Sequence, residues 1–334
     1  MNVISIIILA FAIAGAIDML IGNKIGIGKE FEKGFLLFAP MTFSMLGMLV
    51  LAPAIGVWLT PVFEWFYSVF NIDPSIIPAS LLSNDMGGMT LAQAVCKSQD
   101  IGNFNAYIVA SMTGCVVSFT IPFALGVVKR EQHPQMFFGI LCGIVAIPVG
   151  CFVAGLMCGI GITTLLLTLL PLIIFSAVLG VLLVVIPKIC IKVFSAFGFF
   201  IRCVSIGGMI CAIFTFLTKI KIYEHFDTFE NAAFICVNAC VTLSGALPLM
   251  YVVSKLLHKP FEKMGSKIGI DPTSTVALLS TVVTNAPTFG VMEKMNKKGT
   301  VINSAFAASA AFALGGHLAL TLVYNASYVA PMIV

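Results

Sequence analysis

The sequence contains very little charge. Lys and Arg number 18 and Asp and Glu 14 among 334 residues, so 10 % of the chain is charged and the net charge is +4. A soluble domain carries about 25 % charged residues. So few charges cannot cover the surface of a water-soluble protein of this length. The scarcity excludes a soluble enzyme, a disordered chain and a nucleic-acid-binding protein.

The sequence also lacks the short motifs of common enzymes and ATPases. It contains no HExxH, no GxSxG and no GxxxxGK[ST], so neither catalysis nor ATP-driven transport is expected of it. The ten cysteines form no CxxC pair, and free cysteine packs as a small hydrophobic residue. We therefore expect no metal site and no cofactor. No Lys or Arg precedes the apolar start of the chain, so we do not expect a cleaved signal peptide.

Apolar residues dominate what is there. They make up 60 % of the chain, and the mean hydropathy is +1.09. A spanning helix needs about 20 apolar residues. Segments of about that length occur at 2–22, 34–58, 103–128, 136–159, 163–187, 195–218, 229–254 and 301–325. The pattern predicts an all-α polytopic membrane protein with about eight spanning helices.

Two further segments, 75–97 and 273–293, are only moderately apolar and are interrupted. The first contains the run Ser-Asn-Asp-Met-Gly-Gly and the second the run Thr-Asn-Ala-Pro-Thr-Phe-Gly. We expect Gly87, Gly88, Pro287 and Gly290 to break the helix in these runs. Broken helices at membrane depth are tolerated only where protein or a water-filled cavity satisfies the freed backbone groups.

An internal repeat relates these two segments. A shift of 198 residues brings Phe31-Glu32 onto Phe229-Glu230, Phe63-Glu64 onto Phe261-Glu262, Asp73-Pro74 onto Asp271-Pro272 and the run from Asn105 onto the run from Asn303; Leu81-Leu82-Ser83 falls on Leu278-Leu279-Ser280, one residue off. Paired broken segments indicate a transporter binding site. We therefore divide the chain into a first repeat (1–128), two extra transmembrane helices (129–194) and a second repeat (195–334).

The positive charges predict how the chain threads the membrane. If both interrupted segments are re-entrant hairpins and the N-terminus is outside, 14 Lys and Arg residues lie in inside loops and 3 outside. If both segments span, the numbers are 9 and 8. The positive-inside rule favours the hairpins. The two repeats are then inverted, the hairpins meet at mid-depth, and both termini lie outside.

Asp85 is the main candidate for the substrate site because it is the one carboxylate at the centre of the first interrupted segment. A charge at that depth is costly unless it is paired. Neither segment has a Lys or Arg at its centre, so a cationic substrate or a proton is the expected partner. Alternatively, Asp85 caps the broken helix through its side chain.

Polar neighbours complete the predicted substrate site. Ser83, Asn84, Thr284, Asn285 and Thr288 supply donors and acceptors at the same level, or else satisfy the backbone freed by the breaks. The repeat-related Asn105 and Asn303 either line the site or cap their helices. His317 is a weaker candidate, because a single histidine in a helix bundle is more often structural than a proton relay.

The runs Ser83–Gly88 and Thr284–Gly290, with Leu91-Ala92, resemble the ethanolamine permease family of the bacterial ethanolamine-utilization system. The resemblance extends over most of the chain. It implies uptake of ethanolamine through the bacterial inner membrane. The implied partners are ethanolamine and the lipid bilayer, with a homo-oligomer possible and no nucleic acid.

The residues and the resemblance predict the same chemistry. Protonated ethanolamine carries an ammonium group, which Asp85 would neutralise, and a hydroxyl group, which Asn84, Thr284, Asn285 or Thr288 would bind. We expect a facilitator or carrier with its site between the hairpin tips. The alternatives are a carrier for another small polar solute, such as a nucleoside, coupled to Na⁺ or H⁺, and a scaffold or sensor that moves no solute.

Overall fold

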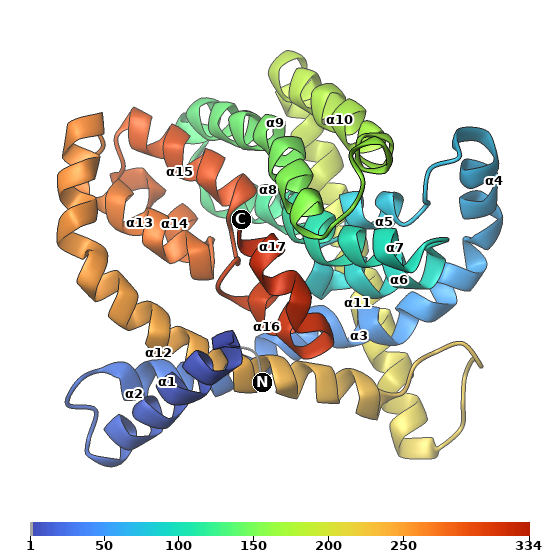
Figure 1. Ribbon diagram of the computed structural model, residues 1–334, viewed down its shortest axis with the longest axis horizontal. Helices are drawn as coiled ribbons and strands as arrows, with labels where there is room; N and C mark the ends of the chain where they lie inside the picture. The colour runs from blue at the N-terminus through green and yellow to red at the C-terminus, as the bar shows by residue number, and fades with distance from the viewer. Residues whose placement is uncertain (1–2) are drawn as a thin grey trace.

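The computed structural model describes residues 3–334, except the side chains of Ser44, Val184, Pro187, Ile191 and His258. Every regular element in this described part is helical, and it contains no strand. Figure 1 shows the helices gathered around a central group, with the N-terminal helices at the lower left and the C-terminus at the middle of the view. The predicted all-α class is confirmed.

Residues 3–128 form four helices, an interrupted segment and a long helix. The first four helices are α1 (Val3–Leu20), α2 (Ile27–Leu36), α3 (Phe38–Trp58) and α4 (Thr60–Phe70). The interrupted segment contains α5 (Ile76–Leu81), η1 (Asn84–Met86) and α6 (Gly88–Val95). The long helix, Gln99–Val127, comprises α7 (Gln99–Phe104), η2 (Asn105–Gly114), η3 (Val116–Thr120) and α8 (Ile121–Val127).

The remaining chain begins with long helices and ends with short ones. The long helices are α9 (His133–Met157), preceded by the single turn η4 (Arg130–Gln132), α10 (Ile162–Val185), α11 (Pro187–Thr218) and α12 (Phe229–Ile268). The second interrupted segment contains α13 (Pro272–Val283), α14 (Ala286–Gly290) and η5 (Met292–Lys294). The chain closes with α15 (Lys297–Ser309), α16 (Gly316–Asn325), η6 (Ala326–Tyr328) and α17 (Val329–Ile333).

Six helices of the described chain are long and apolar enough to cross a membrane, and a seventh candidate is a helix pair bent by 43° within Ile27–Trp58. They correspond to seven of the eight predicted segments. The eighth, 301–325, is not one helix, because the chain turns between Ser309 and Gly316. The count is therefore six or seven rather than about eight, and the chain is a multi-pass membrane protein.

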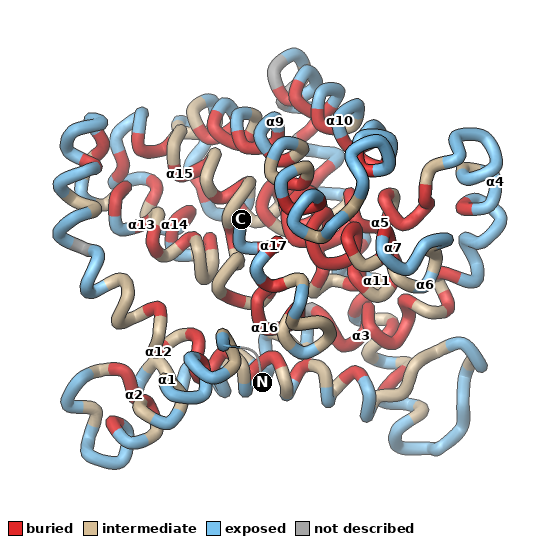
Figure 2. The backbone as a smooth tube through the Cα atoms, viewed as in Figure 1, coloured by how far each residue is buried: buried red, intermediate tan, exposed pale blue. Residues whose placement is uncertain are grey.

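Burial distinguishes the inner helices from the outer ones. In the most apolar part of Gln99–Val127, 78 % of the residues are buried, against 17 % in α1 and 22 % in α11. Apolar helices with exposed faces are what a lipid environment permits. Figure 2 shows the buried residues concentrated in the central helices. The long helix Gln99–Val127 is thus the core against which the interrupted segments pack.

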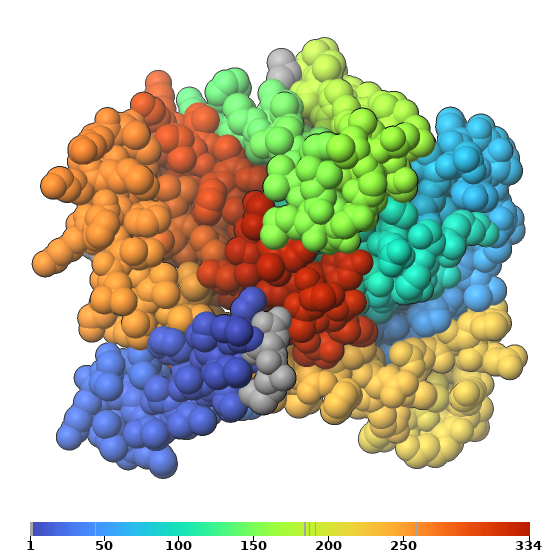
Figure 3. Space-filling model, in the orientation of Figure 1, coloured from blue at the N-terminus to red at the C-terminus, as the bar shows by residue number. Residues whose placement is uncertain are grey.

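The C-terminal segment fills the middle of one face. Figure 3 shows it between the segment that contains α12 and α13 on one side and the segment that contains α9 and α10 on the other. It carries α16, which contacts both α12 and η1. Residues from opposite ends of the sequence therefore meet at the first helix break.

Candidate functional site

Both segments are interrupted at the predicted runs, after Leu81 and after Val283, although Gly88 begins α6 and Pro287 and Gly290 lie within α14. Both breaks contact the same helix. After α5 ends, the backbone N–H of Ser83 donates to Ser118 Oγ at 2.9 Å. After α13 ends, Asn285 Nδ2 donates to Thr120 Oγ1 at 3.0 Å. Ser118 and Thr120 both belong to η3. The two breaks are thus held within one turn of each other along the central helix.

At each break a carbonyl group approaches a glycine closely. A Cβ atom on Gly114 would lie 2.0 Å from the oxygen of Leu82, and one on Gly315 would lie 2.0 Å from the oxygen of Val283. Real Cβ atoms do not approach oxygen so closely, so any larger residue would displace the backbone. Gly114 therefore allows the end of α5, and Gly315 the end of α13, to pack directly against the backbone beside it.

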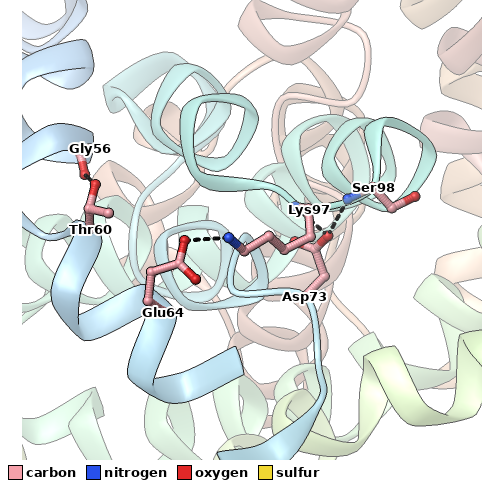
Figure 4. Close-up of polar contacts among 6 residues, drawn as sticks. All are labelled: Gly56, Thr60, Glu64, Asp73, Lys97 and Ser98. Atoms are coloured by element: carbon pink, nitrogen blue, oxygen red, sulfur yellow. Dashed lines mark hydrogen bonds and ion pairs between the residues drawn. The ribbon is translucent and has the colours of Figure 1, made fainter. Parts of the chain in front are cut away.

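Asp73 holds together the two ends of the first interrupted segment. One carboxylate oxygen accepts from the backbone N–H and the hydroxyl of Ser75, which begins the segment. The other accepts from the backbone N–H groups of Lys97 and Ser98, where the segment ends, at 2.9 Å each. Figure 4 shows the contacts of Asp73 with Lys97 and Ser98, and beside them the ion pair between Lys97 and Glu64. The segment therefore returns to its starting point.

Asp271 does the same for the second interrupted segment. Its carboxylate accepts from the N–H and hydroxyl of Ser274 and from the N–H of Asn296 at 2.8 Å. Burial alone would raise the pKa of Asp271, but these hydrogen bonds outweigh it and hold the pKa below the usual value. The ionised carboxylate is therefore the form that makes these hydrogen bonds in the folded protein.

A polar cluster lies at the first break. Ser83 Oγ is 2.5 Å from Asp85 Oδ1 and 3.2 Å from His317 Nε2. Ser83 and His317 are buried, and Asp85 is partly buried. Apart from the chain neighbours and the backbone of its own helix, the nearest heavy atom to a Cβ built on Gly316 would be Asp85 Oδ2, at 3.8 Å. The second carboxylate oxygen therefore lies on the side of Gly316, where a methyl group would fit in ordinary contact with it.

Asp85 has no cationic partner in the part of the chain that the structure describes. The ion pairs found there are Lys33–Glu30, Lys97–Glu64, Lys129–Glu293 and Lys219–Glu230. Only Ser83 donates a hydrogen bond to the Asp85 carboxylate within those residues. The carboxylate can thus accept a positive charge from outside the chain.

The other predicted residues of the breaks bond mainly to the protein. Asn84 Nδ2 donates to Ser111 Oγ at 2.8 Å. Thr288 shares a hydrogen bond with Thr281 and donates to the carbonyl oxygen of Ala277. Thr284 accepts weakly from the N–H of Ala286 at 3.4 Å. The amide oxygens of Asn84 and Asn285 are buried without a partner among the described residues.

Asn105 and Asn303 hold the starts of the interrupted segments. Asn105 Nδ2 donates to Ser75 Oγ at 2.8 Å, and Asn303 Nδ2 donates to the carbonyl oxygens of Ser274 and Gly299. Both side chains are fully buried. Neither bonds to the cluster at Asp85 in the described structure, so their contacts are with the anchoring end of each segment.

His317 lies in the polar cluster at the first break, although the sequence favours a structural role for it. Its position in an apolar segment beside a glycine pair is its only signal in the sequence. The turn between α15 and α16, which the sequence did not predict, brings it to Ser83. The described residues contain no group of three or more His, Cys, Asp or Glu side chains that could hold a metal ion.

Two surface grooves lie elsewhere on the described chain. One, of about 440 Å³, runs along the second interrupted segment and includes Glu262, Ser280 and Pro287. The other, of about 380 Å³, is apolar and lies between α9 and α10. Neither groove includes Asp85.

Comparison with known proteins places the whole chain in one family. The family model described as "Ethanolamine utilisation protein, EutH" matches residues 1–334. A "Probable ethanolamine permease EutH" of Listeria monocytogenes is 35 % identical over 333 residues, which cover 100 % of this chain and 89 % of that protein. One of Salmonella typhimurium is 31 % identical over 335 residues, covering 92 % of this chain and 82 % of that protein.

The "Uncharacterized protein YxeR" of Bacillus subtilis is 33 % identical over 328 residues, covering 98 % of this chain and 89 % of that protein. No solved structure matches the chain. The full-length family match and the identities above 30 % point to the same family as the resemblance of the two break motifs. The chain belongs to the EutH family of ethanolamine utilisation proteins.

Proposed function

We propose that this protein carries ethanolamine, as its cation, into a bacterial cell across the inner membrane. The observation that carries the proposal is the Asp85 carboxylate, which lies among buried residues with one oxygen free and no Lys or Arg beside it in the described chain. An organic ammonium ion would supply the missing charge. The family membership and the names of the relatives support ethanolamine as the substrate.

In this proposal the ammonium group binds Asp85 Oδ2 on the side of Gly316. The substrate hydroxyl needs an acceptor and a donor nearby. The amide oxygens of Asn84 and Asn285 are buried without a hydrogen-bond partner among the described residues. A hydrogen bond from the substrate hydroxyl to either oxygen would therefore stabilise the bound state. Ser83, Thr284 and Thr288 complete the polar wall. The transporter works as a facilitator or carrier, not as an enzyme.

We further propose that the two halves are inverted repeats and that 75–97 and 273–293 are re-entrant hairpins meeting at mid-membrane. The equivalent bonding of Asp73 and Asp271 supports the repeat. At the breaks, Leu82 with Gly114 and Val283 with Gly315 make the same close contact 201 residues apart, three residues more than the shift between the aspartates. Either shift sets an uncharged residue, Val283 or Ala286, opposite Asp85, so in this proposal only the first hairpin carries the charge. The proposed arrangement has both termini outside, and a homo-oligomer is compatible with it.

Uptake of radiolabelled ethanolamine into proteoliposomes tests the proposal. Asp85→Asn removes the charge and keeps the size of the side chain, so we expect uptake to fall at least about ten-fold, equivalent to 1.4 kcal/mol. Asp100→Asn is the matched control, because Asp100 is an exposed carboxylate at the start of α7. Wild-type uptake by the Asp85 variant would reject the assignment of the site. No saturable uptake by the wild-type protein, with or without ion gradients, would reject ethanolamine transport.

A further inference from the structure

The three side chains at the first break form a directed hydrogen-bond chain. A serine hydroxyl has one hydrogen, and an ionised carboxylate can only accept. Ser83 therefore donates to Asp85 Oδ1 at 2.5 Å and must accept from His317 Nε2 at 3.2 Å. This fixes the neutral ring of His317 as the form that carries hydrogen on Nε2. Protonation of the ring adds a hydrogen at Nδ1 and leaves the chain intact.

Asp85 is the charged group that faces His317. The elements packed against α16 are α12, η1, η2, η6 and α17. The described titratable groups in or beside these elements include Asp85 in η1, Tyr107 in η2, Cys115 after η2, Cys236 in α12 and Tyr328 in η6. The cysteine and tyrosine side chains are neutral at physiological pH. Burial lowers the pKa of His317 to about 4, and the Asp85 carboxylate is the charge that opposes this shift, so the ring takes up its proton in acid. The Phe312 ring packs 5.2 Å from the imidazole.

We propose that His317, Ser83 and Asp85 form a proton-binding site from which a substrate ammonium displaces the proton. The inference rests on the proposed function and adds a coupling to it. One carboxylate in a desolvated site balances one positive charge. An imidazolium at His317 balances it through Ser83 on the Oδ1 side, and an ammonium balances it directly at Oδ2. Both together leave an excess positive charge with no other anion beside it.

Binding therefore exchanges one bound proton for one substrate cation. Ethanolammonium enters, the His317 ring returns to its neutral form, and one proton leaves to the solvent. Since protons compete with the substrate, ethanolamine binding weakens as the pH falls through the range in which the site titrates. Displacement of one proton weakens the apparent affinity by about ten-fold for each pH unit. The primary amine of ethanolamine, like that of lysine, stays protonated throughout the acid range, so its own titration does not produce this effect.

Calorimetric titration of the full-length protein in detergent with ethanolamine measures the exchange. Buffers of different ionisation enthalpy report the number of protons released. For the wild type we expect release to approach one proton toward the acid end and the apparent Kd to rise there. His317→Gln keeps an amide donor for Ser83 but cannot take up a proton, so it should bind with a Kd independent of pH and without proton release. His225→Gln, at an exposed histidine, should behave as the wild type.

The outcomes separate the two proposals. Saturable uptake together with binding that releases no proton at any pH would reject the proton site alone. Proton release that persists unchanged in His317→Gln would also reject it. If His317→Gln does not fold, the wild-type protein still decides the matter, because ethanolamine must raise its unfolding temperature less in acid than at neutral pH. Absence of any binding or uptake by the wild type would reject ethanolamine transport, and the proton site would be rejected with it.

Discussion

Asp73 and Asp271 make the same backbone contact 198 residues apart in the chain. Asp73 Oδ2 accepts from the N–H of Ser98, and Asp271 Oδ2 accepts from the N–H of Asn296. Each bond joins the beginning of an interrupted segment to its end. A helix that breaks in its middle loses the hydrogen bonds that would hold it straight. The aspartate that precedes each segment accepts hydrogen bonds from both of its ends, and these bonds fix the geometry of the break instead.

Removing these carboxylates should release the ends of the segments. Asp73→Ala loses hydrogen bonds from Ser75, Lys97 and Ser98, and bonds to a charged group contribute about 1.5–3 kcal/mol each before relaxation. We expect a loss of about 2–4 kcal/mol in the free energy of unfolding. Denaturant titration in detergent measures it, with Asp100→Ala as an exposed control. Unfolding that matches the control would show that the ends are held by packing alone.

The second carboxylate also predicts a pH dependence of stability. Hydrogen bonds depress the pKa of Asp271 in the folded protein, so its stabilisation is fully present above the unfolded pKa of about 3.9 and is lost as the pH falls through the lower folded value. The difference in unfolding temperature between wild type and Asp271→Asn should be constant near neutrality and shrink in acid below about pH 4. A difference that grows on acidification would contradict this sign.

The breaks were predictable from the sequence because they depend on local signals. The run Ser83–Gly88 and the run Thr284–Gly290 contain glycine or proline where an apolar helix should continue, and α5 and α13 both end there. The break within 301–325 was not predictable. There the N–H groups of Phe312 and Leu314 donate to the carbonyl oxygens of Thr281 and Val282. Bonds between distant segments create that turn, so its local sequence does not reveal it.

The site was predictable in part for the same reason. Asp85 and Ser83 lie two residues apart and stand out as polar residues in an apolar segment. His317 joins them only through the turn before α16, over a separation of 234 residues. Conversely, Thr288 looked equally suited to bind substrate, yet its hydroxyl bonds to Thr281 and Ala277 within its own segment. Polar type alone does not show which way a side chain turns.

The glycines against the two breaks should not tolerate alanine. A methyl group on Gly114 or Gly315 would lie 2.0 Å from a carbonyl oxygen of the adjoining half-helix, and overpacking of this kind costs about 1–3 kcal/mol or more. We expect Gly114→Ala and Gly315→Ala to lower the free energy of unfolding by similar amounts. Gly126→Ala is the control, because nothing lies within 4 Å of its Cβ position. A marked difference between the first two variants would argue against their equivalence.

Gly316 should be replaceable for folding but not for transport. The nearest heavy atom to a new methyl group there is Asp85 Oδ2 at 3.8 Å, an ordinary contact, so the unfolding free energy of Gly316→Ala should stay within about 0.5 kcal/mol of wild type. The methyl group would occupy the space through which an ammonium reaches Oδ2. We therefore expect ethanolamine affinity to fall by about ten-fold, or 1.4 kcal/mol.

Calorimetric binding and proteoliposome uptake check this prediction beside thermal unfolding. Gly207→Ala in α11 is the matched control, since no atom lies within 4 Å of its Cβ position. Loss of affinity in Gly316→Ala, with wild-type behaviour in the control, would assign the approach of the ammonium to this side of Asp85. Wild-type affinity in both variants would mean that the substrate does not reach the carboxylate past Gly316.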